Sequence, residues 1–369
     1  MRRQTLAAAG AAAIAVGGLL VGAAPAVAAG TSTAPVVVVN ALNNPRQLAW
    51  ADAGRHQLLV AEAGRGGSNC MNGPQGLTCW GTTGSVSLVL YPQLRNNSAP
   101  DRIVKGLLSG AAPNGSGAVG SDGVTARGLN TLYVPITFAP PGVAGHSQAG
   151  ELLRIHAGVI HNAGNVSGVE FSQNPAGGPI DTNPYGALAL PDGRVLVADA
   201  AGNDIIAVRD GHASVFAVLP PHGCGGHATP MCDREPTPTS LALGPDGNVY
   251  VGELAHEEPG AARVWKLSPW GAILGWRGGF STITGIAFGP NGALYVSQLF
   301  AGGTSGPPGL LTRVVGNTRT DMAVPLPAGV AVDWDGNVFV SVWSLATAEG
   351  VSFGPGTPRV TGQIWKVHF

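Results

Sequence analysis

The chain has 369 residues, of which 44% are hydrophobic and 11% are charged, and its formal net charge is −1. A chain with so little positive charge lacks the basic surface that holds phosphates, so nucleic acid is excluded as an expected partner. The 57 glycines and 29 prolines in so apolar a chain indicate many short strands joined by turns rather than disorder.

The N-terminal segment has the pattern of a secretory signal. Arg2 and Arg3 precede an apolar stretch that ends in the small-residue sequence Ala26-Val27-Ala28. We expect residues 1–28 to be a cleaved signal peptide, with the boundary after residue 28 or 29, and residues 29–369 to be a secreted domain. Twin-arginine and general export both remain open, and an uncleaved membrane anchor is the alternative. No later segment has eighteen unbroken apolar residues, so no other membrane span is expected.

Five similar phrases follow a first expected strand at residues 35–42 (PVVVVNAL). Each runs ten residues from its first position to a glycine, and a second β-rich run comes next. An apolar segment, an Asp-Gly or Asn-Gly pair and another apolar segment predict a β-hairpin, because glycine supplies the positive φ of a tight turn. The phrases are NPRQLAWADAG (44–54), NPYGALALPDG (183–193), TPTSLALGPDG (237–247), TITGIAFGPNG (282–292) and LPAGVAVDWDG (326–336).

A sixth, weaker unit is VTARGLNTLYVPI (124–136), with Asn130 at its turn. A third and a fourth strand are expected after each hairpin, and four antiparallel strands repeated in this way are typical of a propeller blade. The last unit ends after its third strand, so residues 35–42 should complete it and close the ring. The predicted fold is therefore all-β, a single six-bladed β-propeller domain. A β-sandwich or two stacked barrels is the alternative.

The start of each first strand forms one set of candidate binding positions. In a propeller the first strands line the central channel, and the segments leading into them share a face with the loops between second and third strands. The Asp-Gly turns lie on the opposite face and are interpreted as architectural. The positions in this set are Asn44, Arg46, Asn183, Tyr185, Thr237, Thr239, Thr282, Thr284, Leu326 and Ala328.

The ends of the second strands form another set over the same opening: Glu62, Asp199, Glu253, Gln298 and Val342. Asp199 has two interpretations, as a site residue or as an acceptor for nearby backbone N–H groups that fixes a turn. Glu62 and Glu253 present the same choice, but the longer loops after them carry Arg65 and His256. Arg46 and Tyr185 need partners in the channel, and these acids are the available ones.

Four cysteines form two close pairs, Cys70 with Cys79 and Cys224 with Cys232. In an exported chain such pairs most simply form local disulfides. A zinc site is the alternative for the second pair. Its ligands would be His222, Cys224, His227 and Cys232, although their spacing matches no usual zinc pattern.

The phrases NPRQLAW, VAEAGRGG, NPYGALALPDGRVLVADAAGN, EPTPTSLALGPDGNVYVGEL and GIAFGPNGALYV together resemble the ScyD/ScyE family of exported bacterial propellers. The match covers nearly all of the mature chain and is most specific in the third and fourth blades. The resemblance implies a six-bladed fold outside the cytoplasm. For members encoded in scytonemin pigment pathways it implies an accessory role, with no agreed catalytic residues.

The chain is more distantly similar to NHL-repeat propellers and to regucalcin and gluconolactonase-like enzymes. Those enzymes hold calcium or zinc in the channel with a Glu, Asn side chains and an Asp. Here Asn183 matches, but Asn44 stands where the Glu would be, and Thr239 or Ser240 where the Asp would be. Without those carboxylates a divalent cation loses its charge compensation, so a lactonase of that kind is disfavoured.

Two hypotheses for function follow from these patterns. The first is a secreted binding propeller that takes a small molecule, a peptide or a partner protein at the loop-rich mouth. Its contacts would be Asn44, Arg46, Glu62, Asn183, Tyr185, Thr239, Glu253, His256 and Gln298. The alternative is a metal-dependent hydrolase or oxidoreductase, with an ion such as calcium held by Glu62, Asp199 and Glu253.

Overall fold

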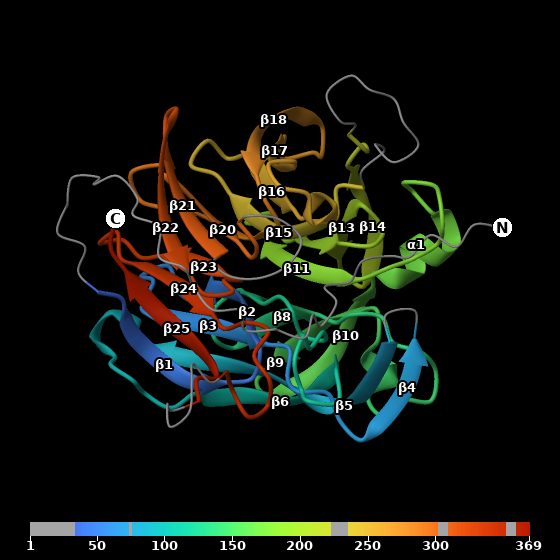
Figure 1. Cartoon of the computed structure of the whole chain (residues 1–369). Helices are drawn as coiled ribbons and strands as arrows, with labels where there is room; N and C mark the ends of the chain where they lie inside the picture. Colours follow the sequence, from blue (N-terminus) through green and yellow to red (C-terminus); the bar gives the residue numbers. More distant parts are fainter. Residues whose placement is uncertain (1–33, 74–75, 223–234, 302–308, 352–358) are drawn as a thin grey trace.

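The computed structural model describes residues 34–73, 76–222, 235–301, 309–351 and 359–369. Within them the chain forms six antiparallel sheets, each built on four strands, and it is all-β and consistent with a six-bladed propeller (Figure 1). The expected signal peptide, residues 1–28, lies outside the described residues. In the described part no helix is long and apolar enough to cross a membrane.

The first two sheets contain the strands between residues 45 and 165. In the first sheet β6 pairs with β5, and β4 and β5 also form a hairpin that extends the sheet. The strands are β2 (Pro45–Trp50), β3 (Gln57–Glu62), β4 (Asn69–Gly73), β5 (Gly76–Leu90) and β6 (Asp101–Ala111), then β7 (Thr125–Ala126), β8 (Thr131–Pro135), β9 (Glu151–His156) and β10 (Val159–Asn165).

The next three sheets follow the chain order strand by strand. Their strands are β11 (Pro184–Ala189), β12 (Val195–Asp199), β13 (Asp204–Arg209) and β14 (His212–Val218); β15 (Pro238–Leu243), β16 (Val249–Glu253), β17 (Ala262–Leu267) and β18 (Ile273–Phe280); and β19 (Ile283–Phe288), β20 (Leu294–Gln298), β21 (Gly309–Val315) and β22 (Thr318–Val324).

The sixth sheet joins the two ends of the described chain. Its order is β1-β25-β24-β23, so β1 (Val36–Leu42) is its outer strand, next to β25 (Gly362–Val367). Val36 lies opposite Lys366 in this pairing, and Figure 1 shows the blue β1 beside the red β25. The other strands are β23 (Val330–Val332) and β24 (Val338–Val342). Residues 35–42 therefore occupy the expected place in the last blade.

Apolar side chains fill the space between neighbouring sheets. Short helices lie in a few of the connections between strands. One core cluster joins the third and fourth sheets through residues such as Leu196, Val251 and Trp265. Neighbouring sheets are therefore held together by burial of their apolar faces. The helices are η1 (Pro92–Leu94), η2 (His146–Gln148), α1 (Ser167–Gln173) and η3 (Ala255–Glu257).

The Asp-Gly and Asn-Gly turns form as predicted in four units. Gly193, Gly247, Gly292 and Gly336 have φ values of 102°, 76°, 77° and 82°, which L residues rarely adopt. The first unit differs from the prediction, because its left-handed residue is Arg55, with φ of 55°, rather than Gly54. Asp52 there accepts backbone hydrogen bonds from residues 56 and 57 and holds a wider turn.

The first strands approach one another so closely that one position in the repeat leaves no room for a side chain in several of the sheets. Each first strand contacts that of the next sheet, and β23 of the last sheet contacts β2 of the first. A Cβ on Gly329 would lie 2.5 Å from the Arg46 carbonyl oxygen, and a Cβ on Gly186 or Gly285 would overlap the equivalent carbonyl of the following sheet. Glycine is therefore required at these positions because the neighbouring backbone is so close, and not because of an unusual φ.

Replacing Gly329 with alanine should lower the free energy of unfolding by about 2 kcal/mol or more, because the atoms that the new methyl group meets are all backbone. Urea unfolding followed by tryptophan fluorescence would measure the change. Gly73→Ala is the matched control, since the nearest atom to its Cβ would be 3.8 Å away. Equal stability of the two variants would contradict the packing constraint.

Candidate functional site

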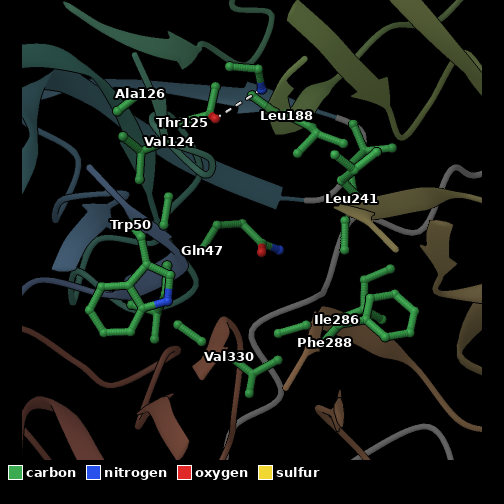
Figure 2. Close-up of a pocket in the computed structure, with 18 of the residues that line it drawn as sticks. Gln47, Trp50, Val124, Thr125, Ala126, Leu188, Leu241, Ile286, Phe288 and Val330 are labelled. Atoms are coloured by element: carbon green, nitrogen blue, oxygen red, sulfur yellow. Dashed lines mark hydrogen bonds between the residues drawn. The ribbon is translucent and has the colours of Figure 1, made fainter. Parts of the chain in front are cut away.

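A pocket of about 290 Å³ lies between the six first strands, toward the ends where their hairpin turns begin. All six sheets contribute lining residues, most of which are aliphatic or aromatic, but polar atoms make up more than half of the surface exposed in the pocket (Figure 2). Its size is close to the lower limit for small-molecule sites. The lining residues of this central pocket are 47–50, 124–126, 187–189, 241–243, 286–288 and 330–332, with Arg55.

Gln47 provides a polar side chain in the middle of the central pocket. Its side chain extends into the middle of the ring of lining residues (Figure 2), and its Nε2 donates to the carbonyl of Thr284 and, at 3.4 Å, to that of Thr239. A side chain from the first sheet thus reaches the fourth and fifth sheets. Gln47 Oε1 accepts no hydrogen bond from the described residues, so it is available to a ligand.

Two rings and a guanidinium group form one side of the pocket and the surface beside it. Trp50 Nε1 and Arg55 Nη1 both donate to the Val332 carbonyl, at 3.0 and 2.7 Å. The Arg55 guanidinium lies 3.9 Å from the centre of the Trp334 ring. Burial lowers the pKa of Arg55 and Asp333 opposes this, but a guanidinium remains charged in proteins. The pocket therefore has a positive charge at its edge.

Arg46 and Tyr185 lie near each other, as predicted, but at the other ends of the first strands. Arg46 Nε is 3.0 Å from Asp122 Oδ1, and its Nη2 donates to the Ala118 carbonyl. Burial raises the pKa of Tyr185 to about 12, with Arg46 opposing and Asp122 adding to the shift. The acid that pairs with Arg46 is therefore Asp122, and the expectation that a second-strand acid would do so was wrong.

Asp122 was missed because the predicted second unit began too late. Counting from Gly120 instead of Val124 places Asp122 at the repeat position of Arg46 and Gly123 at that of Gln47. A Cβ on Gly123 would overlap the Tyr185 carbonyl, as at the other glycines of this position. The glycine pattern was the signal that could have corrected the alignment.

Three more predicted residues at the starts of first strands form hydrogen bonds with loops or with a neighbouring sheet. Asn44 Nδ2 donates to the carbonyls of Gly64 and Gly115, both at 2.9 Å. Asn183 Oδ1 accepts from Thr137 Oγ1 at 2.7 Å. Thr239 Oγ1 donates to the Ile283 carbonyl in the next sheet, also at 2.7 Å. These contacts fasten loops and neighbouring sheets.

Glu62 and Asp199 are buried acceptors for the segment that leads into their first strand. Glu62 accepts from the Asn43 backbone N–H at 2.7 Å and pairs with Arg102, also at 2.7 Å. Asp199 accepts from the Asn183 backbone N–H at 2.6 Å and from Thr182 Oγ1 at 2.5 Å. The structural interpretation of Asp199 is the one that this geometry supports.

Glu253 and Gln298 have comparable contacts. Glu253 is buried, with His222 Nε2 at 2.7 Å from one oxygen and Trp265 Nε1 at 2.5 Å from the other. Gln298 Oε1 accepts from the Ser281 backbone N–H at 2.7 Å. Val342, at the same repeat position, is a buried apolar residue.

The predicted metal ligands Glu62, Asp199 and Glu253 are not brought together. Among the described residues no group of three or more His, Cys, Asp or Glu side chains could hold a metal ion. His256, a predicted contact, lies 3.6 Å from a carboxylate oxygen of Glu235 instead. Of the alternative zinc ligands, His222 bonds Glu253, and the other three, Cys224, His227 and Cys232, lie outside the described residues.

The structure describes only one of the two cysteine pairs. Cys70 and Cys79 form the predicted disulfide, with an S–S distance of 1.98 Å, and they face each other across the β4–β5 hairpin. The predicted pair Cys224–Cys232 lies outside the described residues. The first bridge thus links the two strands of the hairpin that extends the first sheet.

Comparisons with known proteins give the fold. No family model matches the chain and no curated protein matches it. Similar solved structures include the calcium-binding protein regucalcin from Agrobacterium tumefaciens, with a TM-score of 0.51 and 11% identity over 91% of this chain and 94% of that one. A luciferin-regenerating enzyme has a TM-score of 0.50 and 11% identity over 91% and 96%. Virginiamycin B lyase from Staphylococcus aureus is 15% identical over 82% and 80%, with a TM-score of 0.44.

At these identities the comparisons show the β-propeller fold alone. The resemblance to the ScyD/ScyE family stays a prediction, because no family model matches. The assignment of a site to this chain therefore rests on its own geometry.

Arg46→Ala should destabilise the protein at pH 7 by about 3–5 kcal/mol, because Asp122 would stay buried without its cation. Burial already raises the pKa of Asp122, and without Arg46 the rise is larger. A carboxyl group that is more easily protonated when folded loses stability as the pH rises, so the defect should shrink at pH 5. Urea unfolding at both pH values measures it.

The control for this prediction is the double variant Arg46→Ala with Asp122→Ala. It leaves no unpaired charge and should be more stable at pH 7 than Arg46→Ala alone. A single variant with the same deficit at pH 5 and pH 7 would contradict the argument.

Proposed function

We propose that this chain is an exported six-bladed propeller that binds a small molecule in the central pocket, without catalysing a reaction. The observation that carries the proposal is the pocket itself, which combines aliphatic and aromatic side chains with a free amide oxygen from Gln47, a guanidinium from Arg55 and further exposed polar surface. A concave site in which polar groups stand among apolar side chains is typical of ligand binding.

The proposal includes closure of the ring by the N-terminal strand. Its support is the pairing of β1 with β25 and the contact between the sixth and first sheets, where the Gly329 N–H donates to the Arg46 carbonyl at 3.1 Å. A pocket bounded by six first strands requires such a ring. Export is supported by the disulfide Cys70–Cys79 and by the N-terminal sequence pattern.

The chemistry of the pocket favours a ligand with a flat apolar body and an acidic group. Trp50 and Phe288 offer ring surfaces among aliphatic neighbours. Only one guanidinium N–H of Arg55 donates a hydrogen bond within the described residues, to the Val332 carbonyl. The remaining N–H groups can bind a carboxylate or sulfonate, and Gln47 Oε1 can accept from a hydroxyl or amine.

Binding is favoured over catalysis because the candidate acids are already used. Glu62, Asp199 and Glu253 each hold groups of their own sheet, and no metal-binding group of three or more His, Cys, Asp or Glu forms among the described residues. The central pocket lies at the opposite ends of the first strands from these acids. The ScyD/ScyE resemblance agrees with an exported accessory protein.

Anilinonaphthalene sulfonate is a suitable probe, since it combines a flat apolar body with an anionic group. Its fluorescence should rise on binding to the full chain. Arg55→Ala should weaken the binding about tenfold by removing one charge-assisted contact. Ala189→Trp should abolish the binding by filling the pocket. Fluorescence titration measures both effects.

Arg209→Ala is the matched control, because Arg209 is an exposed arginine at the turn between β13 and β14 and is not part of the pocket lining. It should bind the dye as the unchanged protein does. Dye binding that is the same in Ala189→Trp would place the dye elsewhere and contradict the proposal. A chain that does not bind the dye at all would contradict it as well.

A further inference from the structure

A buried carboxyl group without a partner lies in the third sheet, away from the central pocket. Asp204 begins β13, directly opposite Asp199 at the end of β12. It is 1% exposed, and neither of its carboxylate oxygens has a hydrogen-bond partner. Glu170 of α1, 3% exposed, also has one oxygen without a partner. Buried carboxylates are normally paired, so this group needs an explanation.

The surroundings of Asp204 are acidic. Burial, together with the charges of Asp199 and Glu170, raises the pKa of Asp204 to about 8. No cationic side chain among the described residues opposes that shift. The described part of the chain thus provides no positive charge to this cluster.

Gly202 packs against both carboxylates. A Cβ on Gly202 would stand 3.1 Å from Asp199 Cγ, 3.3 Å from Asp199 Oδ2 and 3.3 Å from Asp204 Oδ1, which is tighter than ordinary van der Waals contact. The φ of Gly202 is not in the left-handed range, so the backbone does not require glycine at this position. Glycine therefore lets the two carboxylates lie near each other without a side chain pressing on them.

We propose that a small hard cation, Ca²⁺ in an exported protein, binds between the carboxylates of Asp199 and Asp204. The neighbouring oxygens suit such an ion. Thr182 Oγ1 lies 2.5 Å from Asp199 Oδ2 and 2.8 Å from Ser167 Oγ. Calcium takes six to eight oxygen ligands and commonly completes its shell with water, so two carboxylates can anchor it without a third at ligand distance.

The proposed ion would supply the charge that the cluster lacks. Asp199 already accepts hydrogen bonds from Thr182, Asn183 and Gly202, and these keep its oxygens fixed. Asp204 has no such donors, so the position of its side chain depends on what binds beside it. The site would therefore tie the start of β13 to the end of β12 and, through Thr182, to the segment leading into β11.

The test uses the full chain after treatment with a chelator, at pH 8 and constant ionic strength. Calcium chloride should raise the melting temperature in a saturable way, by about 4 °C at a hundredfold excess over Kd. The rise should be smaller at pH 5, where protons compete for the same carboxylates. Magnesium chloride and sodium chloride at matched ionic strength separate a specific site from general screening.

Two variants locate the effect. Asp204→Asn should remove the calcium response, whereas Asp210→Asn, an exposed aspartate at the end of the same strand, should keep it. Gly202→Ala keeps both carboxylates but presses a methyl group against them, so it should also remove the calcium response. This variant replaces Asp204→Asn if Asp204→Asn does not fold. Isothermal titration calorimetry of each variant with calcium gives an independent measurement.

Three results would overturn the proposal. One is a melting temperature that calcium does not move at pH 8, which would make Asp204 a neutral buried acid. Another is Gly202→Ala with the full calcium response, which would place the ion elsewhere. The third is an equal response to calcium in Asp204→Asn and the unchanged protein.

Discussion

The approach of neighbouring first strands, backbone against backbone, is the constraint on which the rest of the molecule depends. It leaves no space for a Cβ at Gly123, Gly186, Gly285 or Gly329, because a carbonyl of the next sheet occupies it. The six strands are thereby held at a separation that leaves a narrow pocket. Gln47 occupies the same repeat position in the first sheet, and its long side chain crosses the interior instead of packing between strands. Ser240 stands at this position in the fourth sheet, so Gln47 and Ser240 are the two exceptions to glycine there.

The second feature common to the sheets is the attachment of the chain where it leads into a first strand. Glu62, Asp199 and Gln298 all accept a backbone N–H from that segment. A buried acceptor of this kind satisfies an N–H that no strand partner can reach. The requirement is architectural and repeats with the sheets. A ring of carboxylates in the sequence therefore does not by itself indicate a ligand site in a propeller.

Much of the fold could be predicted because the repeat is a local pattern. An apolar segment, a turn glycine and a second apolar segment identify a hairpin wherever they occur, and the unassigned strand at residues 35–42 had one open place to fill. The site could not be predicted in the same way. Arg46 pairs with Asp122, 76 residues away, and Glu62 pairs with Arg102 on β6, a strand outside the repeated phrase. Such partners depend on how whole sheets pack. In the aligned repeats, glycine stands at the position of Gln47 in most of the other units. This was the one local sign that Gln47 is unusual.

The pair Asp199–Asp204 shows why an unsatisfied group deserves a physical explanation. Like charges directly opposite each other on neighbouring strands are destabilising, and burial increases the cost. Asp199 has a role in the fold, since it accepts from the Asn183 backbone N–H, but Asp204 has no hydrogen-bond partner. A proton would remove the charge of Asp204 and give it one O–H to donate, but it would leave the charges of Asp199 and Glu170 uncompensated. A cation would neutralise both carboxylates of the pair and coordinate their oxygens at once. The cation therefore accounts both for the unpartnered oxygens of Asp204 and for the missing positive charge beside it.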